Sequence, residues 1–191
     1  MDAEYLAVVK QLPWLPPEPI ASFRRTHDPT ASVVPPHITL VFPVPTSTVD
    51  AAHFREHVRG VISRTPSFEI RLKGFERSWD HWLFLLVAEG RDEVITLHDE
   101  LYTGVLEPHL WTEQPFHPHV GLGVFVEEGD DQDLLEPRPR KLDREGFDKG
   151  LRDAEALDLD YKGPFDSVHI VVFGDDLRHV GPPEEVHLQN R

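Results

Sequence analysis

The sequence predicts an α+β fold with two similar halves: a bilobal, duplicated fold in which antiparallel or mixed sheets line a central cleft and helices lie outside. Strand-like and helix-like segments alternate along the 191 residues without the long apolar runs typical of parallel sheets. In addition, Pro36-His37-Ile38-Thr39-Leu40 is echoed by Pro118-His119-Val120-Gly121-Leu122, and a strand and a helix precede each copy. Because no long linker separates the halves, we expect one domain over residues 1–191 with two pseudo-symmetric lobes.

The first half is predicted to contain two strands and two helices. An apolar run at residues 5–9 indicates a strand, and a helix is expected over residues 19–27, where Ile20 and Phe23 are three apart. Residues 37–42 form the next strand, with prolines on both sides. Thr48 or Asp50 then caps a helix, whose apolar stripe consists of Phe54, Val58, Val61 and Ile62.

The second half repeats this alternation. Strands are expected at residues 68–75 and 81–87, with a turn at 76–80 between them. A helix is predicted over residues 92–106, with one apolar face made of Val94, Leu97, Leu101 and Val105. Residues 116–126 return to a strand. The remaining expected elements are a weakly amphipathic helix at 142–157, a strand at 167–173 and a short edge strand at 186–188.

Composition and charge exclude several classes of protein. The chain has 19 Lys and Arg against 34 Asp and Glu, a formal net charge of −15. Because affinity for long nucleic acids comes mainly from a basic surface, we expect no DNA partner. A short phosphate ligand is still compatible, since one local Arg outweighs distant, screened acidic groups. The acidic run at residues 127–133 indicates a solvated loop. The absence of cysteine excludes disulfides, thiolate nucleophiles and Cys-based metal sites.

The termini and hydropathy point to a cytoplasmic protein. The N-terminal segment lacks the basic start and the long apolar core of a signal peptide. No stretch approaches the ~18 apolar residues of a membrane span. The expectation is a cytoplasmic monomer without a membrane partner.

The two repeated strands each carry one histidine that is suited to acid–base chemistry. Since residues i and i+2 of a strand share a face, His37 lies with Thr39 and His119 lies with Gly121, while the apolar residues between them face the core. If an internal two-fold places the strands side by side, two imidazoles face one cleft. One can take a proton from a nucleophile and the other can give a proton to a leaving oxygen, as attack on a phosphodiester requires. This chemistry needs no metal or cofactor.

These motifs resemble the two-histidine (2H) phosphoesterase superfamily, the 2′-5′ RNA ligase-like proteins, in which two His-x-Thr/Ser motifs lie in two lobes of a duplicated fold. The resemblance covers nearly the whole chain, from the opening strand and the Arg-rich helix that ends in Asp28-Pro29 to the segments PPHITLVFP and PFHPHVGLGVF. The first motif matches fully. In the second, Gly121 stands where the family usually has Thr or Ser.

The resemblance implies an enzyme that hydrolyses, or reversibly forms, cyclic or 2′-5′ phosphodiesters of small nucleotides or RNA ends. It implies that His37 and His119 are the acid–base pair and that Thr39 binds the substrate phosphate; the direction of the reaction decides which histidine is the base. The backbone N–H of Gly121, or a closer approach of the substrate, partly replaces the missing hydroxyl. The alternative is a degenerate protein that binds a nucleotide or RNA end without cleaving it.

Three more residues are candidate phosphate ligands. Arg24 and Arg25 can bind phosphate as bidentate forks, although a solvated helix face is an equally good interpretation. His117 is expected to line the cleft rim or to bond a phosphate. His117 and His119 are also spaced like two metal ligands on one strand, so a metal-dependent hydrolase is a third hypothesis.

Aromatic residues flank the motif strands. Core packing is expected for most of them, with one free to stack on a nucleobase; the set consists of Phe42, Phe116, Phe125 and Phe173. Trp79 and Trp82 are expected to pack in the core or between the lobes.

Overall fold

A computed structural model describes residues 4–128 and 139–190 of the protein. Most of the acidic run at 127–133 lies outside the described residues. The strands are β1 (Glu4–Gln11), β2 (His37–Pro45), β3 (Phe68–Arg77), β4 (Trp82–Glu89), β5 (His119–Val124), β6 (Asp160–Phe165), β7 (Ser167–Gly174) and β8 (Glu184–His187). The helices are α1 (Ile20–His27), α2 (Ala51–Ile62), α3 (Arg91–Leu101) and α4 (Arg144–Glu155), with a 3₁₀ helix η1 (Gly104–His109).

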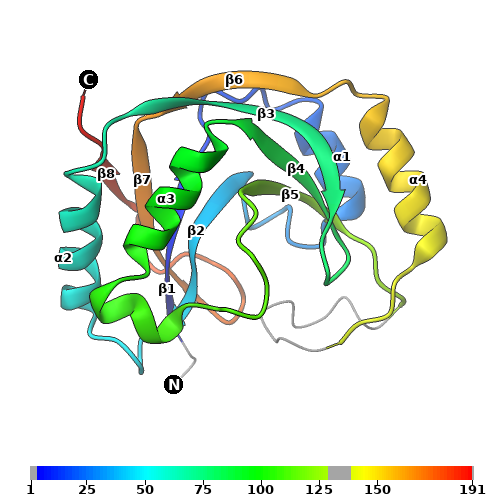
Figure 1. The fold of residues 1–191 in the computed structure, drawn as a ribbon. Helices are drawn as coiled ribbons and strands as arrows, with labels where there is room; N and C mark the ends of the chain where they lie inside the picture. The colour runs from blue at the N-terminus through cyan, green and yellow to red at the C-terminus, as the bar shows by residue number, and fades with distance from the viewer. Residues whose placement is uncertain (1–3, 129–138, 191) are drawn as a thin grey trace.

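One eight-stranded sheet joins the two halves, and its strand order is mirrored about its centre. The order is β6-β3-β4-β5-β2-β1-β7-β8, with antiparallel pairing between neighbours. The central strands β5 and β2 meet at the pair Ile38–Val120 (Figure 1). The sequence segments β1-α1-β2-α2 and β4-α3-β5-α4 therefore occupy matching places. The expected duplication is present, and the two expected lobes share a single sheet.

The first helix of each half packs against the central strand of the other half. Helix α1 contacts β5, and α3 contacts β2. At the first contact, a Cβ added to Gly123 would lie 2.6 Å from the Cβ of His27 and 2.8 Å from its carbonyl oxygen. Only glycine permits this close approach of backbone to backbone. Because each half contributes a helix that packs on the central strand of the other half, the positions of His37 and His119 depend on both halves of the sequence.

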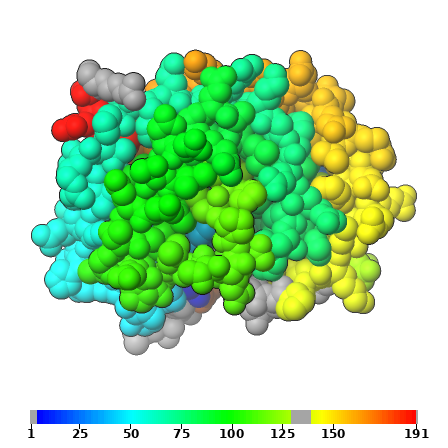
Figure 2. All heavy atoms as spheres, in the orientation of Figure 1, coloured from blue at the N-terminus to red at the C-terminus, as the bar shows by residue number. Residues whose placement is uncertain are grey.

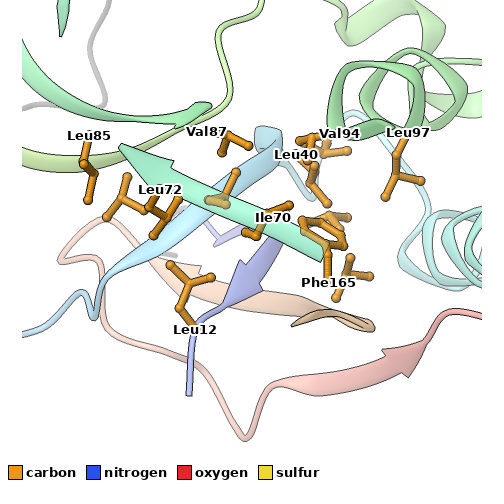
Figure 3. Packing of buried hydrophobic residues seen from close by; sticks show 14 of the residues in the cluster. Leu12, Leu40, Ile70, Leu72, Leu85, Val87, Val94, Leu97 and Phe165 are labelled. Atoms are coloured by element: carbon orange, nitrogen blue, oxygen red, sulfur yellow. The ribbon is translucent and has the colours of Figure 1, made fainter. Parts of the chain in front are cut away.

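Side chains alternate along the central strands as the sequence predicts. Ile38, Leu40, Val120 and Leu122 are completely buried, whereas the residues between them face the cleft described below. The core continues through β3, β4 and the apolar side of α3, as Figure 3 shows with Ile70, Leu72, Leu85, Val87, Val94 and Leu97. Apolar burial of this extent is the main stabilising contribution, at about 25 cal/mol per Å². It holds the two histidine strands on a rigid base.

The predicted N-terminus of α2 is confirmed in detail. The Asp50 carboxylate accepts hydrogen bonds from the backbone N–H groups of Ala52 and His53, at 3.0 and 2.9 Å. This satisfies two donors that have no partner within the helix. The apolar stripe that the sequence predicts for this helix is fully or almost fully buried.

Several predicted boundaries are wrong for identifiable reasons. Strand β2 continues through Pro43 and Pro45, because irregular register with β1 leaves room for residues that lack an N–H donor. The helix predicted to reach residue 106 ends at Leu101, since Gly104 has a φ of 56° and the chain continues as η1. Val105 is consequently 40% exposed instead of lying on an apolar face.

One strand was not predicted at all. Strand β6 contains Gly163 and Pro164, which are unfavourable inside a sheet, and it is tolerated because it lies at the edge of the described sheet, paired with β3. The indole of Trp14 lies against Gly163, so a side chain at this position would collide with it. Within the described ranges, no helix is both long and apolar enough to cross a membrane.

Candidate active site

A cleft of about 420 Å³ lies over the two central strands and contains both repeated motifs. His37, Thr39, His119 and Gly121 all line it. Continuing the pair Ile38–Val120 by one residue in each direction sets His37 across from Gly121 and Thr39 across from His119. The two histidines are therefore diagonal neighbours, a relation that separates residues by about 7–8 Å in antiparallel pairs. Diagonal neighbours project their side chains from the same face of the sheet, so both imidazoles face the same cleft.

Both imidazoles are held in the same way. His37 Nδ1 lies 2.8 Å from the carbonyl oxygen of Pro35, and His119 Nδ1 lies 2.5 Å from that of His117. A carbonyl can only accept, so each neutral ring carries its proton on Nδ1. The repeated motif thus fixes ring orientation and tautomer together, and it leaves each Nε2 as a proton acceptor.

Burial lowers the pKa of both histidines. For His37, burial is the main cause, the Pro35 carbonyl opposes it, and the nearby Arg24 guanidinium lowers the pKa further. For His119, burial lowers the pKa to about 4, opposed by the His117 carbonyl and reinforced by the positive charge that His37 carries when protonated. Both rings are therefore neutral near pH 7 in the free protein.

The two motifs differ in what surrounds the Nε2 atoms. Thr39 Oγ1 lies 3.1 Å from Nε2 of His37, so its hydroxyl can donate to that nitrogen. The second motif has Gly121 at the equivalent position, and a Cβ there would lie 3.5 Å from two ring atoms of Trp82. The ring of Phe84 stacks on His119 with centroids 3.4 Å apart. The site is therefore polar around His37 and aromatic around His119.

The two predicted arginines lie in different places. Arg24 is 4% exposed and lines the cleft, with Nε and Nη2 both donating to Oδ2 of Asp28. The other oxygen of Asp28 accepts from the N–H and the hydroxyl of Thr30. This network fixes the guanidinium in the cleft wall. Arg25 is exposed, pairs with Glu18 at 2.9 Å and does not line the cleft, so it corresponds to the solvated interpretation.

His117 lies at the cleft rim, where its Nδ1 is 3.2 Å from Oε2 of Glu76. Its carbonyl orients His119, so the residue serves the site through its backbone as well. Among residues 4–128 and 139–190, no group of three or more His, Cys, Asp or Glu side chains could hold a metal ion. The metal-site hypothesis for His117 and His119 therefore finds no ligand set in the described part of the chain.

Several cleft residues were not identified from the sequence. Asp28 was assigned only to the end of a helix, yet its carboxylate orients Arg24. Trp79 was expected to be packed, but it is 45% exposed and meets Trp111 edge to face. Phe42, expected to pack in the core by default, is 39% exposed at the cleft. The only available signal was the density of tryptophan next to the predicted turn at 76–80.

The fold and the site together define a duplicated α+β protein with one imidazole from each half in a shared cleft. The chain belongs to the 2′-5′ RNA ligase superfamily, whose family model matches residues 12–172. A Bacillus licheniformis protein named "Putative phosphoesterase" is 27% identical over 115 residues, which cover 60% of this chain and 67% of that protein. A Bacillus pumilus protein of the same name is 28% identical over 126 residues, covering 65% and 72%.

Solved structures show the same fold. E. coli LigT complexed with 3′-AMP superposes with a TM-score of 0.60 at 17% identity, over 98% of this chain and 99% of LigT. LigT complexed with NADP⁺ gives a TM-score of 0.58 at 17% identity, over 99% of each chain. The mirrored sheet is therefore shared with a solved member of this fold group at low sequence identity.

Proposed function

We propose that this protein is a metal-independent phosphoesterase that hydrolyses, or reversibly forms, cyclic or 2′-5′ phosphodiesters of small nucleotides or RNA ends. The observation that carries the proposal is the pair of imidazoles, one from each half, anchored identically through Nδ1 and lining one cleft. Membership of the superfamily and the LigT-like fold support it. The proposal keeps the monomeric state and cytoplasmic location that the sequence predicts, with no cofactor and no DNA partner.

In this proposal, a cyclic phosphodiester lies between the two Nε2 atoms. One Nε2 takes a proton from water as the water oxygen bonds to phosphorus. The bond from phosphorus to a ribose oxygen breaks, and the other imidazolium gives that oxygen its proton. The product is a phosphate monoester with a free hydroxyl, and the two rings have exchanged protonation states. In the ligation direction, a ribose hydroxyl replaces water as the nucleophile.

The remaining groups stabilise charge on the phosphoryl oxygens. Thr39 supplies a hydroxyl, the fixed Arg24 supplies N–H donors that Asp28 does not use, and His117 borders the same space. At Gly121 the backbone is the group closest to the substrate. Donors aimed at a developing oxyanion each contribute about 10²–10³ in rate in other enzymes. The proposal therefore predicts a working site with one hydroxyl donor fewer than the full motif.

Turnover of a 2′,3′-cyclic nucleotide and of a 2′-5′-linked dinucleotide, in the presence of EDTA, tests this proposal. His37→Asn and His119→Asn keep a side-chain N–H near the Nδ1 position and remove Nε2, so they separate chemistry from folding. Each is expected to lower kcat by at least 10²-fold. His187→Ala, at an exposed position on the far edge strand β8, is the matched control and retains activity. Equal rates in all four proteins would refute the proposal.

The second candidate function is binding without catalysis, and Gly121 is the observation that favours it. Without the second hydroxyl, the cleft could hold a nucleotide or RNA end and leave it intact. Calorimetry with a non-hydrolysable phosphodiester analogue separates the two functions. Tight binding together with no turnover across cyclic and 2′-5′ substrates would identify a binding protein.

A further inference from the structure

Three indole rings gather in the part of the cleft beside β5. Trp79 belongs to the β3–β4 turn, Trp82 begins β4, and Trp111 lies between η1 and β5. Trp79 and Trp111 are 45% and 39% exposed and meet edge to face, with centroids 5.1 Å apart and planes at 78°. A cluster of exposed large aromatic rings is costly in water and marks a binding surface.

The segment that carries Trp111 helps to enclose the cleft. Its residues Gln114, Pro115 and Phe116 line the same cavity as His37. In Figure 1 this bright green segment runs beside β2 and β5, and in Figure 2 green atoms of the α3–β5 stretch occupy the middle of the face. The exposed indole pair thus belongs to the wall of the cleft that contains the histidines.

Carboxylates outnumber cationic side chains around the indoles, which disfavours a second phosphate there. The carboxylates of Glu76 and Asp80 line it, beside the rim residue His117. Among the described residues that line the cavity, Arg24 pairs with Asp28 and is assigned to the phosphate between the histidines, so Arg77 is the one remaining guanidinium against these two carboxylates; it lies over the ring of Phe147, with 5.7 Å from its guanidinium carbon to the centroid. The chain as a whole carries −15. A flat, uncharged group is the occupant that these surroundings favour.

The histidines and the three indoles line the same cavity. Trp82 begins this surface, because its ring lies in van der Waals reach of a Cβ at Gly121, across from His37 in the central register. Trp79 and Trp111 extend it outward. The cavity of about 420 Å³ falls in the range of small-molecule sites, about 300–1,000 Å³. This volume is compatible with a mononucleotide.

We propose that Trp79, Trp82 and Trp111 form a nucleobase subsite, so that the substrate is a nucleoside cyclic phosphate with a single phosphate group. Stacking on aromatic side chains takes the place of the cationic contacts that longer RNA requires. The proposal rests on the proposed function only for the position of the phosphate, between His37 and His119.

Tryptophan fluorescence provides a direct test. Adenosine 2′-monophosphate is the base-bearing probe, and ribose 5-phosphate is the base-free probe. The adenosine probe is expected to quench the indole emission. Trp79→Leu and Trp111→Leu are each expected to raise its Kd by roughly 5- to 150-fold, since stacking contributes about 1–3 kcal/mol per base. The Kd for ribose phosphate, measured by calorimetry, stays unchanged. Trp14→Phe, outside the cleft, is the matched control and alters neither Kd.

Each of the following four results would contradict the proposed nucleobase subsite. If both Kd values rise together, the indoles support the fold and do not bind a base. If the adenosine and ribose probes bind equally well to the native protein, no base is recognised. If a 2′-5′ or 3′-5′ oligonucleotide binds far more tightly than the mononucleotide, the substrate is an RNA end. If Trp79→Leu converts a dimer to a monomer in sedimentation, the patch is an interface between two copies. None of these four results would affect turnover that depends on His37 and His119. The nucleobase subsite can therefore be refuted without refuting the proposed phosphoesterase function.

Discussion

Ligand binding is expected to drive proton uptake by His119. In the free cleft its pKa is about 4, so at pH 7 only about one ring in a thousand is protonated. A phosphodiester anion about 4 Å away, at an effective dielectric constant of about 20, favours the imidazolium by about 4 kcal/mol, which is roughly 3 pKa units. The pKa of His119 in the complex then lies near 7. Binding at pH 7 takes up about half a proton.

Isothermal calorimetry measures this uptake. The same titration with a non-hydrolysable phosphodiester, run in buffers of low and high ionisation enthalpy, gives the number of protons bound with the ligand. Since the protonated ring binds the anion better, affinity rises as pH falls from 8 towards 6. His119→Asn is expected to reduce the uptake strongly, because it keeps the His117 carbonyl partner and removes the titrating Nε2. Equal uptake in the native protein and in the double variant His37→Asn/His119→Asn would refute the reasoning.

Three other substitutions test the architecture around the site. Gly121→Ser adds the missing hydroxyl without crowding, since its Cβ would be 3.5 Å from Trp82. It should raise kcat on a cyclic phosphodiester at least tenfold. An unchanged kcat would mean that the backbone N–H of Gly121 already stabilises the phosphoryl oxygen. Gly123→Ala forces a 2.6 Å contact with His27 and should lower the free energy of unfolding by about 1–3 kcal/mol in urea, whereas Gly121→Ala should not. Arg24→Met leaves the Asp28 carboxylate buried without its partner and should lower the free energy of unfolding by about 3–5 kcal/mol in the same assay. Adding Asp28→Asn should restore part of that free energy. No recovery would argue against the ion pair as the cause.

The local features of the fold could be predicted from the sequence because they depend on short-range patterns. Alternation along residues 37–42 and 119–122 placed the histidines on one face, and the stripe and cap of α2 were found from spacing alone. Helix α3 was predicted too long, since apolar spacing continues past Leu101 while the backbone at Gly104 does not. Strand β6 received no prediction, because Gly163 and Pro164 disfavour a strand and only the edge position seen in the structure permits one.

The surroundings of the site depended on long-range contacts that a single sequence does not display. The i,i+4 spacing of Arg24 and Asp28 is visible in the sequence, but the burial of this ion pair beside the cleft depends on residues that are distant in the sequence. Trp79 and Trp111 meet only because the β3–β4 turn and the segment before β5 border the same cavity. The repeated motif predicted two similar halves that differ at Thr39 and Gly121, but it did not show that Phe84 stacks on His119 while the Thr39 hydroxyl lies next to His37. The residues that differ between the two halves, rather than those that repeat, therefore determine which substrate fits the cleft.

That difference orients the substrate and assigns the roles of the two histidines. Trp82 and Phe84 lie on β4, the neighbour of the His119 strand β5, and Phe84 stacks on His119. A base that stacks on the indoles therefore puts the ribose on the His119 side, so that the ester oxygen that leaves with the ribose faces His119, while water faces His37. His119 is then the acid and His37 the base for hydrolysis. A cyclic ester whose leaving oxygen is replaced by sulfur needs no acid, because a thiolate leaves without a proton. On that substrate His119→Asn should recover most of its lost kcat, while His37→Asn should stay impaired. Recovery in His37→Asn instead would reverse the assignment and place the base on the other side of the phosphate.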